Sequence, residues 1–237
     1  MSVRASIDLL EWERRFFSLS RRLGLIFSES APLLNGERLA DFSLVQAKVP
    51  ANRVDIIDEL SALDFHFVEG EVDFSLVVDR GADLTPELRF SCRLATENDI
   101  PQLRAVASDI FRHSRFRTPW YQPDDSSRFY ALWIEKAVLG TFDRQCLLLE
   151  DAQGKSLGFV TLRAIDESQG RIGLLGVWPE GGNKGIGLEL MKVAKRWCAE
   201  QGLKRLCVAT QMGNLAALRL YIRSGASISS TAYWLYR

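Results

Sequence analysis

The chain has 237 residues, a length that allows one large domain or two modest ones. Hydrophobic residues make up 47% of it and charged residues 25%, which is the composition of an ordinary soluble globular protein. Lys and Arg together number 30, as do Asp and Glu, so the formal net charge is zero. This balance argues against nucleic acid as a partner, because salt-driven binding to nucleic acid needs a basic excess.

The first part of the chain shows a mixed α/β pattern. Its predicted elements are short helices over residues 39–48 and 54–63 and a long strand or a hairpin over residues 65–78. The polar, turn-rich run at residues 79–86 predicts a linker. We therefore predict a smaller α/β N-terminal domain over residues 1–84 and a second domain over residues 85–237.

The second part of the chain predicts a mixed sheet flanked by helices. Residues 96–99 (Thr-Glu-Asn-Asp) have the form of a capping box, with Asp in place of Glu or Gln, and predict the start of a helix near residue 100. The other predicted helices cover residues 127–139, 185–201 and 214–224, and the predicted strands cover residues 90–95, 145–150, 157–164, 171–177, 205–210 and 229–236. The order β-α-α-β-β-β-α-β-α-β predicts the α/β fold class, with a mixed α+β sheet.

Cysteine usage argues against a metal site. The four cysteines contain no C-x-x-C pair, and only His66 and His113 could join them as ligands. Free cysteines of this kind suit a reducing compartment. The first thirty residues carry several charges and no apolar run long enough for a signal peptide or a membrane span. We therefore expect a cytoplasmic protein without a bound metal and without membrane insertion.

A glycine-rich turn joins the strand that ends at Val177 to the next helix. Its residues are Gly181, Gly182, Asn183, Lys184, Gly185, Ile186 and Gly187. Such a turn frees backbone N–H groups, and the first turn of a helix adds unpaired donors and the positive end of its dipole. Together they predict a cradle for a phosphate or pyrophosphate. The spacing fits neither a P-loop nor a dinucleotide-binding turn. A plain tight connection between strand and helix is the alternative.

The strand, the turn and the helix together resemble motif A of the GCN5-related N-acetyltransferase (GNAT) family, R/Q-x-x-G-x-G/A, except that the R/Q position falls on Gly182. Residues 211–226 resemble motif B of the same family, N-x-x-A-x-x-x-Y-x-x-x-G, with Asn214 and Tyr221 at the motif positions. The resemblance implies a GNAT fold for the second domain. It also implies acetyl-CoA as co-substrate, with its pyrophosphate on residues 181–187, and acetyl transfer to an amine.

Motif B supplies the candidate for proton transfer. Asn214 and Tyr221 are seven positions apart and so share a helix face, about 10 Å apart along the axis. We expect Asn214 and Leu220 to contact the cofactor and Tyr221 to be the general acid. A phenol with a pKa near ~10 is protonated at neutral pH and can donate to a departing thiolate. The simpler alternatives are a helix N-cap for Asn214 and a packing residue for Tyr221.

Outside the two motifs as well, the chain resembles members of this family that acetylate amino sugar nucleotides. The segments that carry this resemblance are residues 3–7, 45–48, 68–73, 114–121 and 230–237. It implies a dTDP-linked 4-amino-4,6-dideoxygalactose as acceptor, a role in enterobacterial common antigen synthesis and, by family analogy, a homodimer. An acetyltransferase for another amine, such as a protein N-terminus or a polyamine, and a non-catalytic acyl-CoA-binding module stay open as alternatives.

The family resemblance also implies an acceptor site between the first two helices of the second domain, and in this chain arginines alternate with aromatic residues there. Such side chains can grip a diphosphate and stack on a base, although a solvated basic loop is the alternative. The candidates are Arg115, Arg117, Trp120 and Tyr121. For the general base, the strand period places Glu69, Glu71 and Asp73 on one face. Glu69 is the candidate and His113 the alternative, with ordinary solvated strand charges as the simpler interpretation.

Overall fold

The computed structural model describes residues 3–10, 13, 17, 22–78, 88–111, 114–179 and 184–237. Its strands are β1 (Ala5–Leu9), β2 (Arg22–Phe27), β3 (Leu44–Pro50), β4 (His66–Val77), β5 (Ser91–Leu94), β6 (Gln145–Glu150), β7 (Ser156–Ala164), β8 (Gln169–Val177), β9 (Arg205–Gln211) and β10 (Ser227–Tyr236). Its helices are α2 (Gly36–Leu39), α3 (Val54–Ala62), the 3-10 turn η1 (Glu97–Asp99), α4 (Ile100–Ile110), α5 (Asp125–Val138), α6 (Ile186–Glu200) and α7 (Leu215–Arg223).

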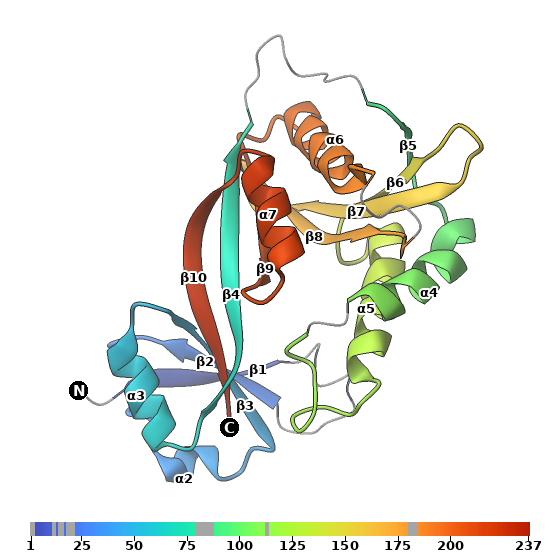
Figure 1. The fold of residues 1–237 in the computed structure, drawn as a ribbon. Coiled ribbons are helices and arrows are strands. Elements are labelled where there is room, and N and C mark those ends of the chain that lie inside the picture. The colour runs from blue at the N-terminus through green and yellow to red at the C-terminus, as the bar shows by residue number, and fades with distance from the viewer. Residues whose placement is uncertain are drawn as a thin grey trace.

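The strands form one mixed sheet in the order β1-β2-β3-β10-β4-β9-β8-β7-β6-β5. The pairs β2–β3 and β8–β9 are parallel, and the other neighbours are antiparallel. The long strands β4 and β10 run from the smaller N-terminal part of the molecule into the larger part that carries α4 to α7 (Figure 1). β4 lies before the predicted boundary at residue 84, yet it pairs with β9 and β10, which follow it. The division into two domains stays a prediction.

The helices of the larger part cover both faces of the sheet. Val160 of β7 packs in one buried cluster with Leu190 of α6, whereas Phe159 packs in a second cluster with Ile134 of α5. Because successive side chains of a strand point to opposite faces, α6 and α7 lie on one face and α4 and α5 on the other (Figure 1). A third cluster joins β1, β2, β3 and α3 in the N-terminal part.

The structure confirms the α/β fold class and the element order predicted for the second part of the chain, with end points that differ by one or two residues at most positions. The predicted capping box is present, and the backbone N–H of Thr96 donates to Asp99 Oδ2 over 2.8 Å. The predicted helix over residues 54–63 is α3, and residues 65–78 contain one long strand, β4, instead of a hairpin. The predicted linker at residues 79–86 lies outside the described residues.

The predicted helix over residues 39–48 is wrong. Leu39 ends the short helix α2, and β3 begins at Leu44. Val45, Ala47 and Val49 are fully buried at alternate positions of β3, which pairs with β2 and β10. The local pattern of these residues also fits a short helix, but hydrogen bonding to a strand on each side makes the segment a strand. Neither β1 nor β2 was predicted.

Candidate active site

A cavity of about 570 Å³ lies where β8 and β9 separate. The parallel pairing of these strands ends at Ile172 and Val208, although β8 continues to Val177 and β9 to Gln211. Residues beyond the last pair line the cavity from both strands, including Leu175. Backbone groups on the facing edges of the two strands are therefore placed to bind an extended ligand.

The cavity passes from one face of the sheet to the other. On the α6 and α7 face it is lined by Asn214, Ala216, Ala217, Leu220 and Tyr221 of α7 and its N-cap. On the opposite face it is lined by Phe129, Tyr130 and Trp133 of α5. Two substrates, a group donor that enters from one face and a group acceptor that enters from the other, would therefore meet at the sheet.

A bulge in β8 marks the point where the two strands separate. Val160 pairs with Leu175 and Leu162 with Ile172, so two residues of β8 oppose Thr161 of β7. The backbone N–H of Leu174 donates to Thr161 Oγ1 over 2.8 Å. A bulge bends its strand, and this one follows directly after the last residue that pairs with β9.

Gly173 in the bulge has no room for a side chain. A Cβ atom at Gly173 would overlap Asp143 Oδ2 and lie 2.8 Å from Thr161 Oγ1. The Asp143 carboxylate is fully buried and accepts hydrogen bonds from Thr161 Oγ1 (2.6 Å), from Trp133 Nε1 (2.8 Å) and from Arg163 Nη1. Asp143 therefore ties the bulge to two residues that line the cavity on the α5 face.

Only part of the predicted pyrophosphate loop can be located. Gly181, Gly182 and Asn183 lie outside the described residues. Gly185 has a φ of 78° directly before α6, a conformation that glycine adopts without strain. A Cβ atom at Gly187 would lie 3.1 Å from Leu220 Cδ2, so the start of α6 packs closely against α7.

Lys184, Gly185, Ile186 and Gly187 are described but do not line the cavity, and the Ile186 side chain is buried in the core. The pyrophosphate role of this loop stays a prediction. Gly187, at the described end of this loop, lies beside Leu220 of α7, which lines the cavity. The loop and α7 are therefore close enough to contact the same ligand.

The two motif B residues lie on the same cavity. The Asn214 side chain accepts the backbone N–H of Ala217 over 3.1 Å, so this residue is the N-cap of α7 and lines the cavity as well. Tyr221 is 5% exposed, lines the cavity and packs edge-on against Phe74, with the ring centroids 5.5 Å apart. Burial raises the pKa of Tyr221 above the ordinary value of a phenol, so the hydroxyl stays protonated at neutral pH.

Carboxylates of β4 line the cavity on the α5 face. Glu69 and Glu71 both contribute to its wall. Glu71 binds Lys48 Nζ at 2.5 Å and accepts Trp234 Nε1 at 2.9 Å, which holds it in place. Glu69 Oε1 accepts the backbone N–H of Gly70 over 3.1 Å. The alternative base, His113, lies outside the described residues.

Of the predicted acceptor residues, Arg115 alone lines the cavity among the described residues. Its guanidinium lies 4.0 Å from the ring centroid of Trp234 and donates to Gln46 Oε1 over 2.8 Å. Tyr121 is buried, and its hydroxyl accepts Gln46 Nε2 over 2.8 Å.

The other two predicted acceptor residues lie behind this wall. Trp120 packs edge-on against Tyr236, with ring centroids 5.7 Å apart, and Arg117 donates to the backbone carbonyl of Val68 over 3.1 Å. In this structure these residues support the wall of the cavity and do not face into it.

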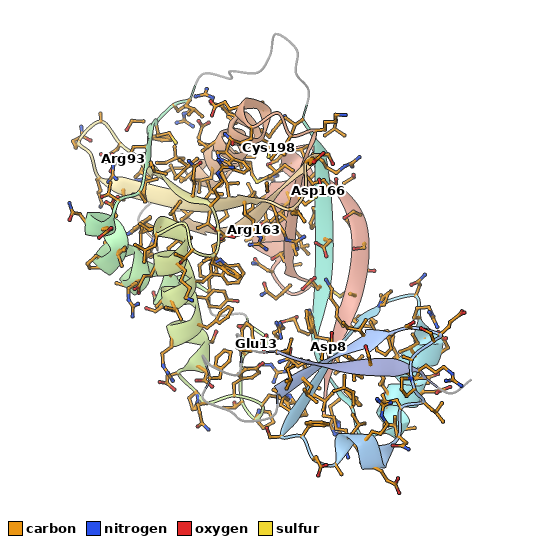
Figure 2. All side chains as sticks on the ribbon, turned by 180° about the vertical axis from the view of Figure 1, so that it is seen from behind. Asp8, Glu13, Arg93, Arg163, Asp166 and Cys198 are labelled. Atoms are coloured by element: carbon orange, nitrogen blue, oxygen red, sulfur yellow. The ribbon has the colours of Figure 1, made fainter. Side chains whose placement is uncertain are left out.

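Sequence reasoning missed a polar group of residues on the α5 face of the cavity. Trp133, Arg163 and Arg171 line the cavity, and buried Asp143 lies behind them. No motif connects these residues, which come from α5, β7, β8 and the connection between α5 and β6. Arg163 lies near the middle of the molecule, between the helices and the long strands (Figure 2).

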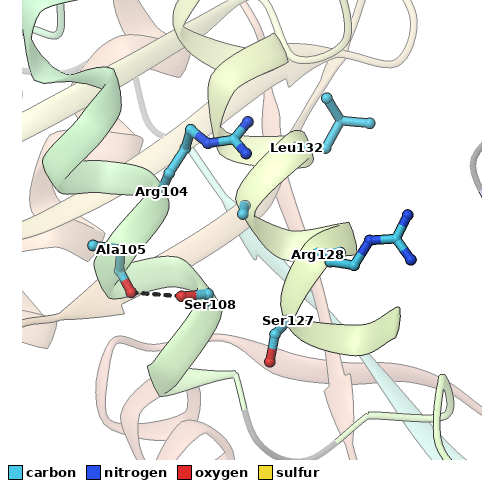
Figure 3. Close-up of a pocket in the computed structure, with 7 residues that line it drawn as sticks. Arg104, Ala105, Ser108, Ser127, Arg128 and Leu132 are labelled. Atoms are coloured by element: carbon cyan, nitrogen blue, oxygen red, sulfur yellow. Dashed lines mark hydrogen bonds between the residues drawn. The ribbon is translucent and has the colours of Figure 1, made fainter. Parts of the chain in front are cut away.

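A second cavity, of about 460 Å³, lies between α4 and α5 and contains none of the predicted site residues (Figure 3). Its lining residues are Arg104, Ala105, Ser108, Ser127, Arg128, Ala131 and Leu132. Within the described ranges, no group of three or more His, Cys, Asp or Glu side chains could hold a metal ion. No helix of the described chain is both long and apolar enough to cross a membrane.

Sequence comparison identifies the family. A model of the acetyltransferase (GNAT) family matches residues 107–226. The chain is 50% identical to the dTDP-fucosamine acetyltransferase of Escherichia coli O6:H1 over 237 residues, which is 100% of both chains. It is 27% identical over 138 residues to the mycothiol acetyltransferase of Propionibacterium freudenreichii subsp. shermanii, which covers 57% of this chain and 42% of that relative.

Solved structures support the same fold. A functionally unknown conserved protein from Staphylococcus epidermidis matches with a TM-score of 0.65 at 15% identity, over 99% of this chain and 90% of that one. A GCN5-related N-acetyltransferase from Sphaerobacter thermophilus matches with a TM-score of 0.63 at 13% identity, over 100% of this chain and 76% of that one. The family resemblance inferred from motifs A and B is confirmed: the chain belongs to the GNAT acetyltransferase family.

Proposed function

We propose that this acetyltransferase transfers the acetyl group of acetyl-CoA to the 4-amino group of dTDP-4-amino-4,6-dideoxy-D-galactose (TDP-fucosamine). The observation that carries the proposal is the 50% identity to a dTDP-fucosamine acetyltransferase over the full length of both chains. The assignment to enterobacterial common antigen synthesis, a cytoplasmic location and a homodimer belong to the same proposal and rest on the family resemblance.

The cavity supports direct attack of the amine on the thioester. Among its described lining residues there is no cysteine that could carry the acetyl group. The new C–N bond forms as the C–S bond breaks, so the reaction needs a base for the ammonium proton and an acid for the thiolate. Glu69 on the α5 face can accept the first proton, directly or through water. Tyr221 on the α7 face can donate the second, and both line the same cavity.

The proposal is tested by incubating the protein with acetyl-CoA and the amino sugar nucleotide and following the product by mass spectrometry. We expect a mass gain of one acetyl group and release of one free thiol per product. Polyamines and N-terminal peptides serve as competing acceptors. Faster acetylation of either would overturn the proposed acceptor while leaving the acetyltransferase assignment in place.

The Glu69→Gln substitution is expected to lower kcat/KM for the amino sugar nucleotide by about 10²-fold at neutral pH, because it removes the proton acceptor. The loss should shrink as pH rises through the pKa of the amine, since solvent then removes that proton before binding. Steady-state rates across pH check both expectations. Glu150→Gln is the control, because Glu150 of β6 pairs with Arg93 of β5 and does not line the cavity. An equal loss at every pH would contradict the role of Glu69 as base.

The Gly185→Val substitution is expected to weaken acetyl-CoA binding about 10-fold or more, because the side chain blocks the approach of a pyrophosphate to the start of α6. Gly154→Val is a matched control. Gly154 has a φ of 76° and Gly185 a φ of 78°, and neither has a close neighbour for a Cβ atom, so both variants carry the same backbone strain. Calorimetry on both variants separates the two effects. Equal affinities would show that residues 181–187 do not hold the pyrophosphate.

A further inference from the structure

Two arginines face each other across neighbouring strands of the cavity wall. Arg163 of β7 and Arg171 of β8 are direct partners in the antiparallel ladder, and both line the cavity. Their side chains are 30% and 26% exposed. Like charges directly opposite each other destabilise a sheet. The stability of the sheet therefore does not explain why two arginines lie opposite each other here.

Each arginine is held from one side by its own carboxylate. Arg163 donates to buried Asp143 through Nη1, and Arg171 donates to Asp73 Oδ1 through Nη2 over 2.9 Å. Among the described residues, these are the only hydrogen bonds of the two guanidinium groups. Their remaining nitrogens are not among the buried polar atoms that lack a partner. Each guanidinium thus keeps N–H groups that a ligand in the cavity can reach. Guanidinium groups bind phosphate oxygens through paired, charge-assisted hydrogen bonds.

Aromatic side chains flank this pair on the α5 side. The Arg163 guanidinium lies 5.5 Å from the ring centroid of Phe142. Trp133 meets Phe142 edge-on, with centroids 5.2 Å apart, and its Nε1 is fixed by Asp143. Both aromatic residues line the cavity. They offer flat apolar surface next to cationic groups, which is the combination that a nucleotide base and its phosphates need.

The charged strand residues that line this wall come from different strands according to their sign. Carboxylates Glu69 and Glu71 project from β4, whereas the arginines project from β8 and β7. β9 lies between β4 and β8, so the carboxylates are anchored two strand spacings from Arg171, roughly 10 Å, and three from Arg163, roughly 14 Å. An amino sugar nucleotide carries an amine at one end of its sugar and a diphosphate at the other. The layout of the wall matches that order.

We propose that Arg163 and Arg171 bind the diphosphate of the acceptor nucleotide and that Trp133 and Phe142 contact its base. The inference rests on the proposed function, since it assigns the nucleotide part of that same acceptor. It moves the diphosphate contact away from the four acceptor candidates predicted from the sequence, of which Arg115 alone lines the cavity among the described residues. These candidates instead support the wall next to the carboxylates.

The test compares two acceptors, the amino sugar nucleotide and the free amino sugar, with the wild type and with Arg163→Gln and Arg171→Gln. For each substitution, the ratio of kcat/KM for the nucleotide to that for the free sugar is expected to fall about 10–100-fold, the worth of charged hydrogen bonds. The inhibition constant of dTDP should rise by a similar factor. Arg163→Lys keeps the charge and loses the paired geometry, so it should fall between the wild type and Arg163→Gln.

Arg93→Gln is the matched control. Arg93 is also a strand arginine held by carboxylates, Asp99 and Glu150, but it belongs to β5 at the edge of the sheet and does not line the cavity (Figure 2). It should change neither the acceptor ratio nor the inhibition by dTDP. Melting temperature and acetyl-CoA affinity identify variants that have lost their fold.

The outcomes are distinct. If the wild type acetylates the sugar nucleotide and both glutamine variants keep its acceptor ratio, the diphosphate assignment is wrong and the proposed function stands. If the wild type neither acetylates the sugar nucleotide nor binds dTDP, the proposed function falls and the assignment falls with it. A loss of both acceptors to the same extent would show that the arginines only support the wall, which also overturns the assignment.

Discussion

The Tyr221→Phe substitution is expected to lower kcat by about 10²–10⁴-fold, the usual worth of a positioned general acid. Phenylalanine keeps the ring and its edge-on contact with Phe74, and removes only the hydroxyl group. Burial raises the pKa of Tyr221, so the group that is lost is a protonated donor at neutral pH. The thiolate would then have to take its proton from solvent.

Acetyl-CoA affinity should change much less than kcat, because the substitution leaves the backbone edges of β8 and β9 and the start of α6 untouched. Pre-steady-state and steady-state rates, together with calorimetry, separate the two quantities. Tyr233→Phe is the control, since Tyr233 of β10 packs edge-on against Phe67 of β4 and does not line the cavity. A Tyr221→Phe enzyme with near-native kcat would show that Tyr221 is a packing residue. A loss of acetyl-CoA binding as large as the loss of kcat would point to a structural role.

Local sequence patterns predict the positions of some residues of the candidate site, while the roles of these residues stay predictions. Asn214 and Tyr221 are seven positions apart on one helix, so helix geometry alone puts them on one face, and both line the cavity. The face of α6 that carries Ile186, Leu190 and Trp197 is buried as its periodicity predicts. Such patterns need no knowledge of distant segments.

The N-terminal strands show where this reasoning ends. β3 was mistaken for a helix because its seven residues are defined by partners far away in the chain, above all β10 at the C-terminus. Short segments carry too little periodicity to distinguish a helix from a strand, so pairing with neighbouring strands of the sheet determines the structure.

The α5 face of the cavity could not be predicted for the same reason. Arg163 and Arg171 become neighbours through the register of β7 and β8, and Trp133 reaches Asp143 from a helix that precedes both strands. Nothing in the local sequence of any of these residues indicates that they meet. Residues 114–121 have the more conspicuous composition, but the side chains of Tyr121 and Arg117 are used to hold segments of the fold together.

The Asp143→Ala substitution is expected to lower the free energy of unfolding by about 3 kcal/mol. Asp143 is 0% exposed, and its removal leaves Trp133 Nε1 and Thr161 Oγ1 without their acceptor and Arg163 without its ion pair. A buried donor that loses its partner costs roughly 1–3 kcal/mol, which makes the sum of this order. Denaturant unfolding monitored by circular dichroism measures it.

Asp166→Ala is the matched control for this experiment. Asp166 is also a carboxylate that accepts several hydrogen bonds, from Ser168 and Gln169, but it lies in an exposed turn, where water replaces the lost contacts (Figure 2). Its removal should therefore cost much less than the removal of Asp143. Equal losses for the two variants would contradict the special role of the buried carboxylate.

Gly173→Ala tests the same carboxylate from the other side. It leaves Asp143 in place but puts a Cβ atom where its Oδ2 lies, so either the carboxylate or the bulge of β8 must move. Overpacking of this kind costs about 1–3 kcal/mol. The bulge lies where β8 leaves β9, and Asp143 also holds Trp133 and Arg163 of the cavity wall. We therefore expect kcat/KM for the amino sugar nucleotide to fall in the Gly173→Ala and Asp143→Ala variants. A folded Gly173→Ala enzyme with native stability and native kcat/KM would show that the cavity does not depend on this contact.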